Sequence, residues 1–314
     1  MNLQFKPITL ESKSIIEKYT KGWQLECSDL SFTNLFIWGT NNKMEYAQWE
    51  NCLYIKLDYT GVPVYLWAPI PYFGVEVDYR KAVDVALDYM RSIGTEPTLR
   101  SVWSPFKEKI EACYPELKIK PLDIAWDYVY DRESLATLKG KKYHGKRNYI
   151  NRFLANYPDY QYKKVTPDMI SDCMKLYDEW SEQKEESSIE LFEERESVHL
   201  ALEHMEELGL TGGSIWINER MVAFTLGERL LPHMQLIHIE KGESGIDGVY
   251  PMINQQYVLH ECQDVTLINR EEDMGIEGMR KAKHSYHPVK MIEKYIVCTR
   301  ELSDKELWTL SPDN

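Results

Sequence analysis

The chain has 314 residues, 43% of them hydrophobic, so it can bury one large core or two ordinary ones and is not a disordered protein. Its 50 acidic and 37 basic residues give a net charge of −13, which argues against coating duplex DNA or an anionic membrane through the overall field. The longest uncharged run, 59–75, contains three prolines and two glycines, which excludes it as a membrane span.

The sequence begins MNLQFKPITLES, which lacks the charged head, apolar run and small-residue cleavage site of a secretion signal. We therefore expect a cytoplasmic protein. The cysteines are scattered without a C-x-x-C pair, and neither His199 with His204 nor His284 with His287 has nearby cysteines or spaced carboxylates. We expect reduced structural thiols and no metal site.

Three short strands are predicted early in the chain, at 44–49, 53–58 and 62–67. In the middle one Leu53, Ile55 and Leu57 alternate with other residues, the period-two pattern of a half-buried strand. A helix follows at 78–94, because its apolar residues fall on one stripe and Gly94 supplies the stop. A strand at 98–103, a short helix at 105–113 and a strand at 124–130 come next.

The same order of elements returns later in the chain. We expect a hairpin of strands at 213–217 and 222–226, a strand at 233–239, a helix at 249–262, a strand at 265–269, a short helix at 277–283 and a last strand at 290–298. Each half also begins with helical segments, at 11–19 and 32–38 in the first and at 168–185 and 190–208 in the second.

Corresponding elements keep a nearly constant separation. Their starts pair as 44 with 212, 78 with 246, 98 with 265 and 124 with 290, which gives offsets of 168, 168, 167 and 166 residues. This spacing predicts an α/β protein with mixed sheets of the α+β kind, built from two tandem domains of the same topology. We place the domains at 1–133 and 134–314.

The predicted order, helices followed by a three-strand meander, a crossover helix and a further parallel strand, resembles the GNAT acyltransferase fold in tandem. Two stretches, LKGKKYHGKRNYINRF (138–153) and NREEDMGIEGMRKAKHSYHP (269–288), are similar to the lysylphosphatidylglycerol synthetase C-terminal-like family, which is related to the Fem-type aminoacyltransferases. The resemblance implies transfer of an acyl or aminoacyl group to an amine or hydroxyl. It also implies a donor carried on coenzyme A or on tRNA.

A glycine-rich loop precedes the long helix of the second domain and contains Gly242, Gly245 and Gly248. Such a loop could aim backbone amides at a donor diphosphate, and we expect it to open onto a crevice. Its spacing departs from the Q/R-x-x-G-x-G/A loop usual for coenzyme A, and the alternative is a plain connection capped by Asp247. The matching first-domain segment, 69–74, is rich in proline, so we expect it to be packed shut and that domain to lack an active site.

A basic segment stands out in this acidic chain, because residues 134–158 contain no acid. Its cations are Lys139, Lys141, Lys142, Lys146, Arg147 and Arg152. In a helix over 144–154, Arg147, Ile150 and Leu154 would form one face while Lys142 and Lys146 can turn outward. We expect this helix to face the crevice of the second domain rather than open solvent. The segment suits the phosphates of a donor or a tRNA end, and the alternative is a solvated inter-domain surface.

Acidic residues follow the strand at 265–269, at the carboxyl edge where parallel strands bind ligands. Glu272 or Asp273 could there accept a proton from an attacking amine. Arg280 and Lys283 put two cations on one side of the next helix, and the family resemblance implies that Tyr286 protonates the leaving group. Charge alternation on an exposed helix is the alternative.

These patterns predict an acyltransferase or aminoacyltransferase whose site lies in the second domain. Its donor-binding residues would be Lys142, Lys146, Arg147, Arg280, Lys283 and the three loop glycines, and its catalytic residues Glu272, Asp273 and Tyr286. The donor would be acyl-CoA or aminoacyl-tRNA, with no other cofactor. The alternative is a catalytically silent module that binds a phosphate-bearing ligand or a tRNA end, and a third hypothesis is a structural interaction protein.

Overall fold

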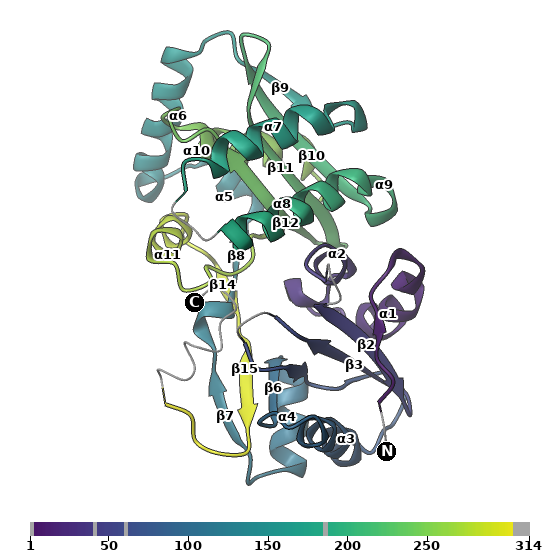
Figure 1. The fold of residues 1–314 in the computed structure, drawn as a ribbon. Coiled ribbons are helices and arrows are strands. Elements are labelled where there is room, and N and C mark those ends of the chain that lie inside the picture. Colours follow the sequence, from purple (N-terminus) through teal and green to yellow (C-terminus); the bar gives the residue numbers. More distant parts are fainter. Residues whose placement is uncertain (1–2, 40–42, 60–61, 185–187, 304–314) are drawn as a thin grey trace. The chain divides into compact units, whose positions relative to one another are not determined.

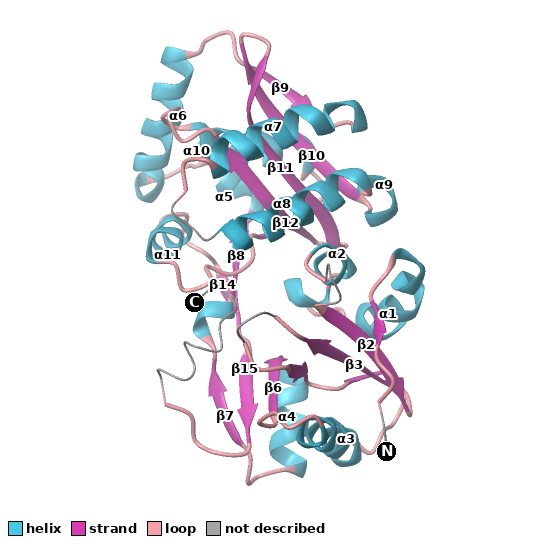
Figure 2. Cartoon of the chain, viewed as in Figure 1, coloured by secondary structure: helices cyan, strands magenta, loops and turns pink. Residues whose placement is uncertain are grey.

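The computed structural model describes residues 3–39, 43–59, 62–184 and 188–303. Figures 1 and 2 show two mixed sheets with helices packed on them, which confirms the predicted mixed α/β fold. The chain divides into two compact units. The first contains residues up to 126, 272–275 and those from 292 onward, and the second contains 127–271 and 276–291.

The first unit contains a sheet in the order β1-β2-β3-β4-β6-β15-β7, with β5 also pairing with β3. Its strands are β1 (Lys6–Pro7), β2 (Met44–Trp49), β3 (Cys52–Leu57), β4 (Tyr65–Trp67), β5 (Ile70–Pro71), β6 (Thr98–Val102), β7 (Lys118–Pro121) and β15 (Tyr295–Cys298). Its helices are α1 (Lys13–Thr20), α2 (Phe32–Ile37), α3 (Tyr79–Ser92) and α4 (Ser104–Cys113). The predicted strands at 44–49, 53–58 and 98–103 are therefore present.

Helix α3 is determined by its apolar stripe and by the residues that cap its two ends. Asp78 accepts a hydrogen bond from the backbone N–H of Lys81 at 3.0 Å, which caps the first turn. Every apolar residue of the predicted stripe is buried: Ala82, Val83, Ala86, Leu87 and Met90. Gly94 follows the helix with a φ of +76°, a left-handed conformation that stops it.

The second unit contains a sheet in the order β14-β8-β13-β12-β11-β10-β9. Its strands are β8 (Asp127–Asp131), β9 (Gln161–Lys164), β10 (Leu210–Ile217), β11 (Arg220–Leu231), β12 (Met234–Gly242), β13 (Leu267–Asn269) and β14 (Lys290–Ile292). Its helices are α5 (Arg132–Thr137), α6 (His144–Asn156), α7 (Ile170–Ser181), α8 (Ser188–Glu203), α9 (Met205–Leu208), α10 (Val249–Glu261) and α11 (Glu277–His284). Glu185, where the helix predicted at 168–185 was to end, lies outside the described residues.

Helices cover both faces of the second sheet. Successive residues of β12 show this, because Glu240 reaches Asn254 of α10 while Lys241 lies 3.5 Å from the ring centre of Trp180 in α7. Figure 1 shows α7 and α8 crossing the strands on one side. On the other side α10, α5 and α6 enclose a core that includes Phe153, which is fully buried.

The single strand predicted at 290–298 is wrong, because the segment forms two strands in different sheets. β14 pairs with β8 in the second sheet, whereas β15 pairs with β6 and β7 in the first. β8, which precedes the second half in sequence, pairs with β13 of the second sheet. Each sheet therefore takes one strand from the far side of the division expected at 133/134, and that division stays a proposal.

Among the described residues, no helix is long and apolar enough to cross a membrane. No disulfide joins the six cysteines, all of which belong to the described part of the chain.

Candidate functional site

The candidate site of the second unit lies where β12 and β13 part. These parallel strands pair only from Met234 with Leu267 to Leu236 with Asn269, while β12 continues to Gly242. The ends of parting parallel strands are where open α/β sheets bind ligands. Polar groups from both strands meet here.

An arginine and a glutamate form the base of this site. Arg270 follows β13 directly, and its Nη2 donates to Oε1 of Glu240 on β12 at 2.9 Å. Asn254 of α10 donates to the other carboxylate oxygen at 3.1 Å. The side chains of Arg270 and Glu240 are only 12% and 13% exposed. Within the described residues, Nη1 of Arg270 is buried without a hydrogen-bond partner.

Two cations lie over the ring of Tyr286. Nζ of Lys146, from α6, is 3.9 Å from the ring centre, and the guanidinium of Arg270 is 4.8 Å from it. Burial, together with the nearby charge of Arg270, lowers the pKa of Lys146 to about 8, and Glu240 only partly opposes this. Near neutral pH, Lys146 is therefore a cation that can lose its proton.

Tyr286 is a buried phenol whose proton is retained at neutral pH. Burial raises the pKa of Tyr286 well above its ordinary value, more than nearby Arg270 lowers it. Its backbone oxygen accepts a hydrogen bond from the hydroxyl of Tyr143 at 3.2 Å, and its ring packs edge-on against Tyr130. A neutral phenol beside two cations is able to donate a proton to a developing anion.

The structure gives the predicted donor-binding cations different surroundings. Lys146 lies over the ring of Tyr286 in this cluster rather than pointing away from it, and its role in holding a donor stays a prediction. Lys283 donates to the backbone oxygen of Arg270 at 2.7 Å. Arg147 instead donates to the backbone oxygens of Leu138 and Gly140. Lys142 is exposed and Arg280 half-buried.

The glycine loop makes its close approach to helix α6. Gly248 has a φ of +82°, and a Cβ on it would lie 2.4 Å from the backbone oxygen of Tyr149. A Cβ on Gly242 would lie 3.0 Å from Val249, whereas Gly245 faces open space. The space next to Gly248 is thus filled by the chain itself, and the role of these glycines in holding a diphosphate stays a prediction.

The predicted base residues lie in the segment 272–275, which belongs to the first unit. Asp273 is fully buried, and its Oδ1 accepts a hydrogen bond from the backbone N–H of Gly275 at 2.8 Å. Glu272 has a carboxylate oxygen 3.9 Å from Nζ of Lys294. Both carboxylates therefore have partners in their own unit, and their role as a base stays a prediction.

In the first unit, aromatic rings fill the position where its parallel strands part. β4 and β6 pair at Leu66 with Leu99 and at Trp67 with Arg100. Trp67 packs edge-on against Trp103, which packs against Phe106. Buried aromatic rings thus lie at this place in the first unit, next to the buried side chain of Arg100.

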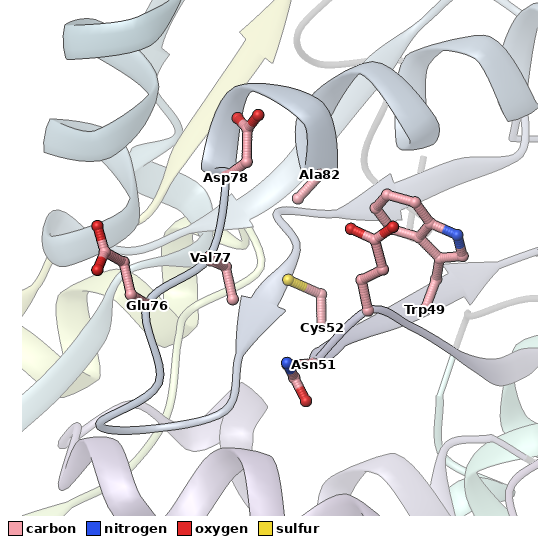
Figure 3. A pocket seen from close by; sticks show the side chains of 8 residues that line it. Trp49, Asn51, Cys52, Glu76, Val77, Asp78 and Ala82 are labelled. Atoms are coloured by element: carbon pink, nitrogen blue, oxygen red, sulfur yellow. The ribbon is translucent and has the colours of Figure 1, made fainter.

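A cleft of about 120 Å³ lies elsewhere in the first unit (Figure 3). Figure 3 shows Glu76 and Asp78 on the segment leading into α3 and Asn51 at the turn between β2 and β3. Glu50 also lines the cleft and pairs with Lys81 at 2.9 Å. None of the residues that line this cleft belongs to 69–74, the segment expected to be packed shut, so that expectation stays a prediction. Three carboxylates make this cleft a poor site for a phosphate-bearing donor.

The family assignment rests on a match over most of the chain. A family model described as "Phosphatidylglycerol lysyltransferase, C-terminal" matches residues 23–298. The chain belongs to this family. A crystal structure of a conserved protein of unknown function from Bacteroides thetaiotaomicron is 35% identical, with a TM-score of 0.81, and the match covers 95% of this chain and 100% of that chain.

Structures with lower sequence identity share the fold of this chain. L-PGS from Bacillus licheniformis is 15% identical with a TM-score of 0.60, over 88% of this chain and 92% of its own. A tandem GNAT protein from the clavulanic acid biosynthesis pathway is 12% identical with a TM-score of 0.50, over 96% and 100%. At these identities the likeness shows a fold of the tandem GNAT-like kind and nothing further.

A curated relative gives a shorter match. An uncharacterized protein of Mycoplasmoides gallisepticum is 24% identical over 174 residues, which cover 54% of this family member and 55% of the relative. The match thus spans about half the length of that relative.

Sequence reasoning missed three members of the cluster: Glu240, Asn254 and Arg270. Arg270 stands directly after the predicted strand at 265–269, at the carboxyl edge where parallel strands bind ligands. That position could have identified it as a candidate site residue. Glu240 and Asn254 gave no such signal, because only the strand register and the packing of α10 bring them to Arg270.

Proposed function

We propose that this protein transfers an acyl or aminoacyl group from an activated carrier to an amine at the cluster in the second unit. The observation that carries the proposal is the pair of cations, Lys146 and Arg270, over the buried phenol of Tyr286 at the parting strands. Membership of a family described as phosphatidylglycerol lysyltransferase supports aminoacyl transfer as the reaction class.

In this reaction the acceptor nitrogen attacks the carbonyl carbon of the donor. A C–N bond forms, the C–O or C–S bond to the carrier breaks, the amine loses one proton to a base, and the departing carrier takes one up. Lys146 and Arg270 would hold an anionic group of the ligand next to the reacting carbonyl, and Tyr286 would protonate the leaving group.

The glycine loop supports aminoacyl-tRNA over coenzyme A as the donor. Coenzyme A needs backbone amides at the start of the crossover helix for its diphosphate. Here Asp247, just before that helix, pairs with Arg152 of α6 at 2.6 Å, and Tyr149 fills the space next to Gly248. Exposed Lys141 and Lys142 at the start of α6 would contact the tRNA end. In this proposal the reaction occurs in the cytoplasm, where charged tRNA is made.

A transfer assay tests this function. Purified protein would be incubated with lysyl-tRNA, other charged tRNAs or acetyl-CoA, and with acceptors that include phosphatidylglycerol and small amines. We expect product from an aminoacyl-tRNA, and about a hundredfold slower transfer by Lys146→Met, because losing a contact that positions the ligand misplaces the reacting atoms. Lys175→Met is the matched control, because Lys175 is an exposed lysine of α7 that has no part in the proposed site.

Two outcomes would contradict the proposal. Product at equal rates from wild type and Lys146→Met would place the chemistry elsewhere. A rise in thermal stability with charged tRNA but no product with any acceptor would leave the catalytically silent binding module as the function.

A further inference from the structure

The turn around Arg270 is fixed by more hydrogen bonds than is usual for a residue in a loop. Its backbone N–H donates to the oxygen of Tyr128 at 3.0 Å, and its backbone oxygen accepts a hydrogen bond from Nζ of Lys283 at 2.7 Å. The side chains of both sequence neighbours, Asn269 and Glu271, make hydrogen bonds of their own. The whole turn is therefore fixed, from its backbone to its side chains.

Asn269 fixes the start of this turn. It is fully buried, its Nδ2 donates to a carboxylate oxygen of Asp127 at 2.9 Å, and its Oδ1 accepts a hydrogen bond from the backbone N–H of Glu271 at 2.7 Å. One amide side chain thus connects β8 to both ends of the turn.

Glu271 fixes the end of the turn through a buried histidine. Its φ is +54°, an unfavourable conformation for a residue with a side chain. Its carboxylate lies 2.9 Å from Nδ1 of His238, and Nε2 of His238 lies 3.0 Å from a carboxylate oxygen of Glu228. The His238 side chain is 1% exposed. Because each ring nitrogen faces a carboxylate, both carry a proton and the ring is an imidazolium.

The side chain that this turn presents carries unused donor capacity. Nη2 of Arg270 is bound to Glu240, while Nη1 is buried without a hydrogen-bond partner in the described part of the chain. Lys146 adds a second cation over the same Tyr286 ring. Two positive charges against the single carboxylate of Glu240 leave one excess positive charge at the site.

We propose that His238 and Glu271 are positioning residues that fix Arg270, and that Nη1 of Arg270 and Nζ of Lys146 together bind one anionic oxygen group of the ligand. The group is a phosphate or a carboxylate, which both offer oxygens to a guanidinium and an ammonium. The inference deepens the proposed function and rests on it for the location of the site. Anion binding itself requires no transfer.

The pH dependence of binding distinguishes the two cations. His238 is faced by Glu228 from β11 and by Glu271. Burial lowers the pKa of His238, but the two carboxylates outweigh it and raise that pKa to about 9. Above this pH the ring is neutral, and two carboxylates face each other without an intervening charge. The turn that carries Arg270 then loses its support.

Lys146 loses its charge at a lower pH. It is faced by Arg270, Glu240 and the ring of Tyr286, and its pKa is about 8. The affinity for an anion should therefore fall in two steps as the pH rises. The first step belongs to Lys146 and the second to His238.

The test is isothermal titration of the full chain with sodium sulfate between about pH 6 and about pH 10, a range in which sulfate keeps its charge. Sulfate stands for a phosphate, and a second series with sodium acetate stands for a carboxylate. We expect His238→Gln to weaken binding about tenfold below pH 8, because a charge-assisted hydrogen bond is lost, and to remove the second step. Lys146→Met should remove the first step and leave the second.

Two further variants keep the test decisive. Glu271→Gln retains the side-chain size and should weaken binding in the same direction if His238→Gln folds poorly. His260→Gln, on the exposed end of α10, is the matched control and should bind as wild type does. Stronger sulfate binding identifies a phosphate ligand, and stronger acetate binding a carboxylate.

The inference is overturned if wild type binds neither anion, or if folded His238→Gln binds with wild-type affinity and both pH steps. Its failure is distinguishable from failure of the proposed function. Anion binding with the predicted pH steps but no acyl transfer would leave the positioning role intact, whereas transfer without these steps would remove it.

Discussion

The backbone oxygen of Tyr149 lies 2.4 Å from where a Cβ on Gly248 would stand. The backbones of α6 and the start of α10 thus approach each other closely at this point, and Gly248 also has a left-handed φ of +82°. Both facts forbid a side chain at this position. The contact anchors the helix that carries Lys146, so the glycine serves the site through packing.

Gly248→Ala should therefore destabilise the second unit by about 2 kcal/mol or more, because it adds both a backbone clash and a strained φ. Denaturant unfolding followed by circular dichroism would measure this. Gly245→Ala is the matched control in the same loop, since nothing lies within 4 Å of its Cβ position, and it should change stability little. Equal effects of the two substitutions would contradict this packing argument.

Lys146 should give the transfer reaction an alkaline limb. Its pKa of about 8 means that it becomes neutral above that pH, so a rate that depends on its positive charge should decline there. Lys146→Arg keeps the charge at all these pH values and should move the decline upward. Initial rates against pH, corrected for spontaneous donor hydrolysis, would check this. An unchanged alkaline limb in Lys146→Arg would assign it to another group.

His238 should make stability depend on pH. Its folded pKa of about 9 exceeds the ordinary value of 6.5, so its contribution is fully present below pH 6.5 and is lost as pH rises through about 9. The contribution of His238 to the free energy of unfolding is on the order of 3 kcal/mol. His238→Gln should flatten this part of the stability profile, measured as urea midpoints across the range. A wild-type profile that rises steadily between these pH values would contradict the assignment.

In the first unit, Asp29 should be needed to hold a buried lysine. Nζ of Lys294 is 2.5 Å from Oδ1 of Asp29, and its side chain is 2% exposed. Asp29→Asn leaves that charge without its nearest carboxylate and should cost about 3 kcal/mol. Glu17→Gln, which breaks the exposed pair with Lys21, is the control and should cost less than about 0.5 kcal/mol. Similar shifts in the thermal midpoint for Asp29→Asn and Glu17→Gln would contradict the expected dependence of the cost on the burial of Lys294.

The sequence predicted those helices and strands that are determined by residues close to one another in the chain. β2, β3 and α3 follow from alternation, a helical stripe and a stop at Gly94, and the structure has them within one or two residues. β7 was missed because Lys118–Pro121 is an edge strand with two lysines and a proline, which reads as a loop. The break of 290–298 into β14 and β15 was missed because only sheet pairing reveals it.

The candidate site shows the same limit. The basic segment was recognisable from charge alone, but the direction of Lys146 was not, because Ile150 and Phe153 rather than Leu154 form the buried face of α6. The charged residues 270–273 after β13 were recognised for their acids. Arg270 was missed because a basic residue next to acids is also expected on an ordinary exposed surface. Its partner Glu240 is distant in sequence, so only the register of two parallel strands connects them.

The pairing of β15 also determines when the first unit can be completed during synthesis. β15 lies between β6 and β7 in the first sheet, yet the ribosome makes it only after the strands and helices of the second unit. Until then the nascent first unit presents β6 as an unpaired sheet edge, and β7 has no neighbour to join. Such edges attract other chains, so a nascent chain that stalls within the second unit exposes an aggregation-prone surface. The N-terminal half therefore cannot finish folding first, as domains in a row usually do.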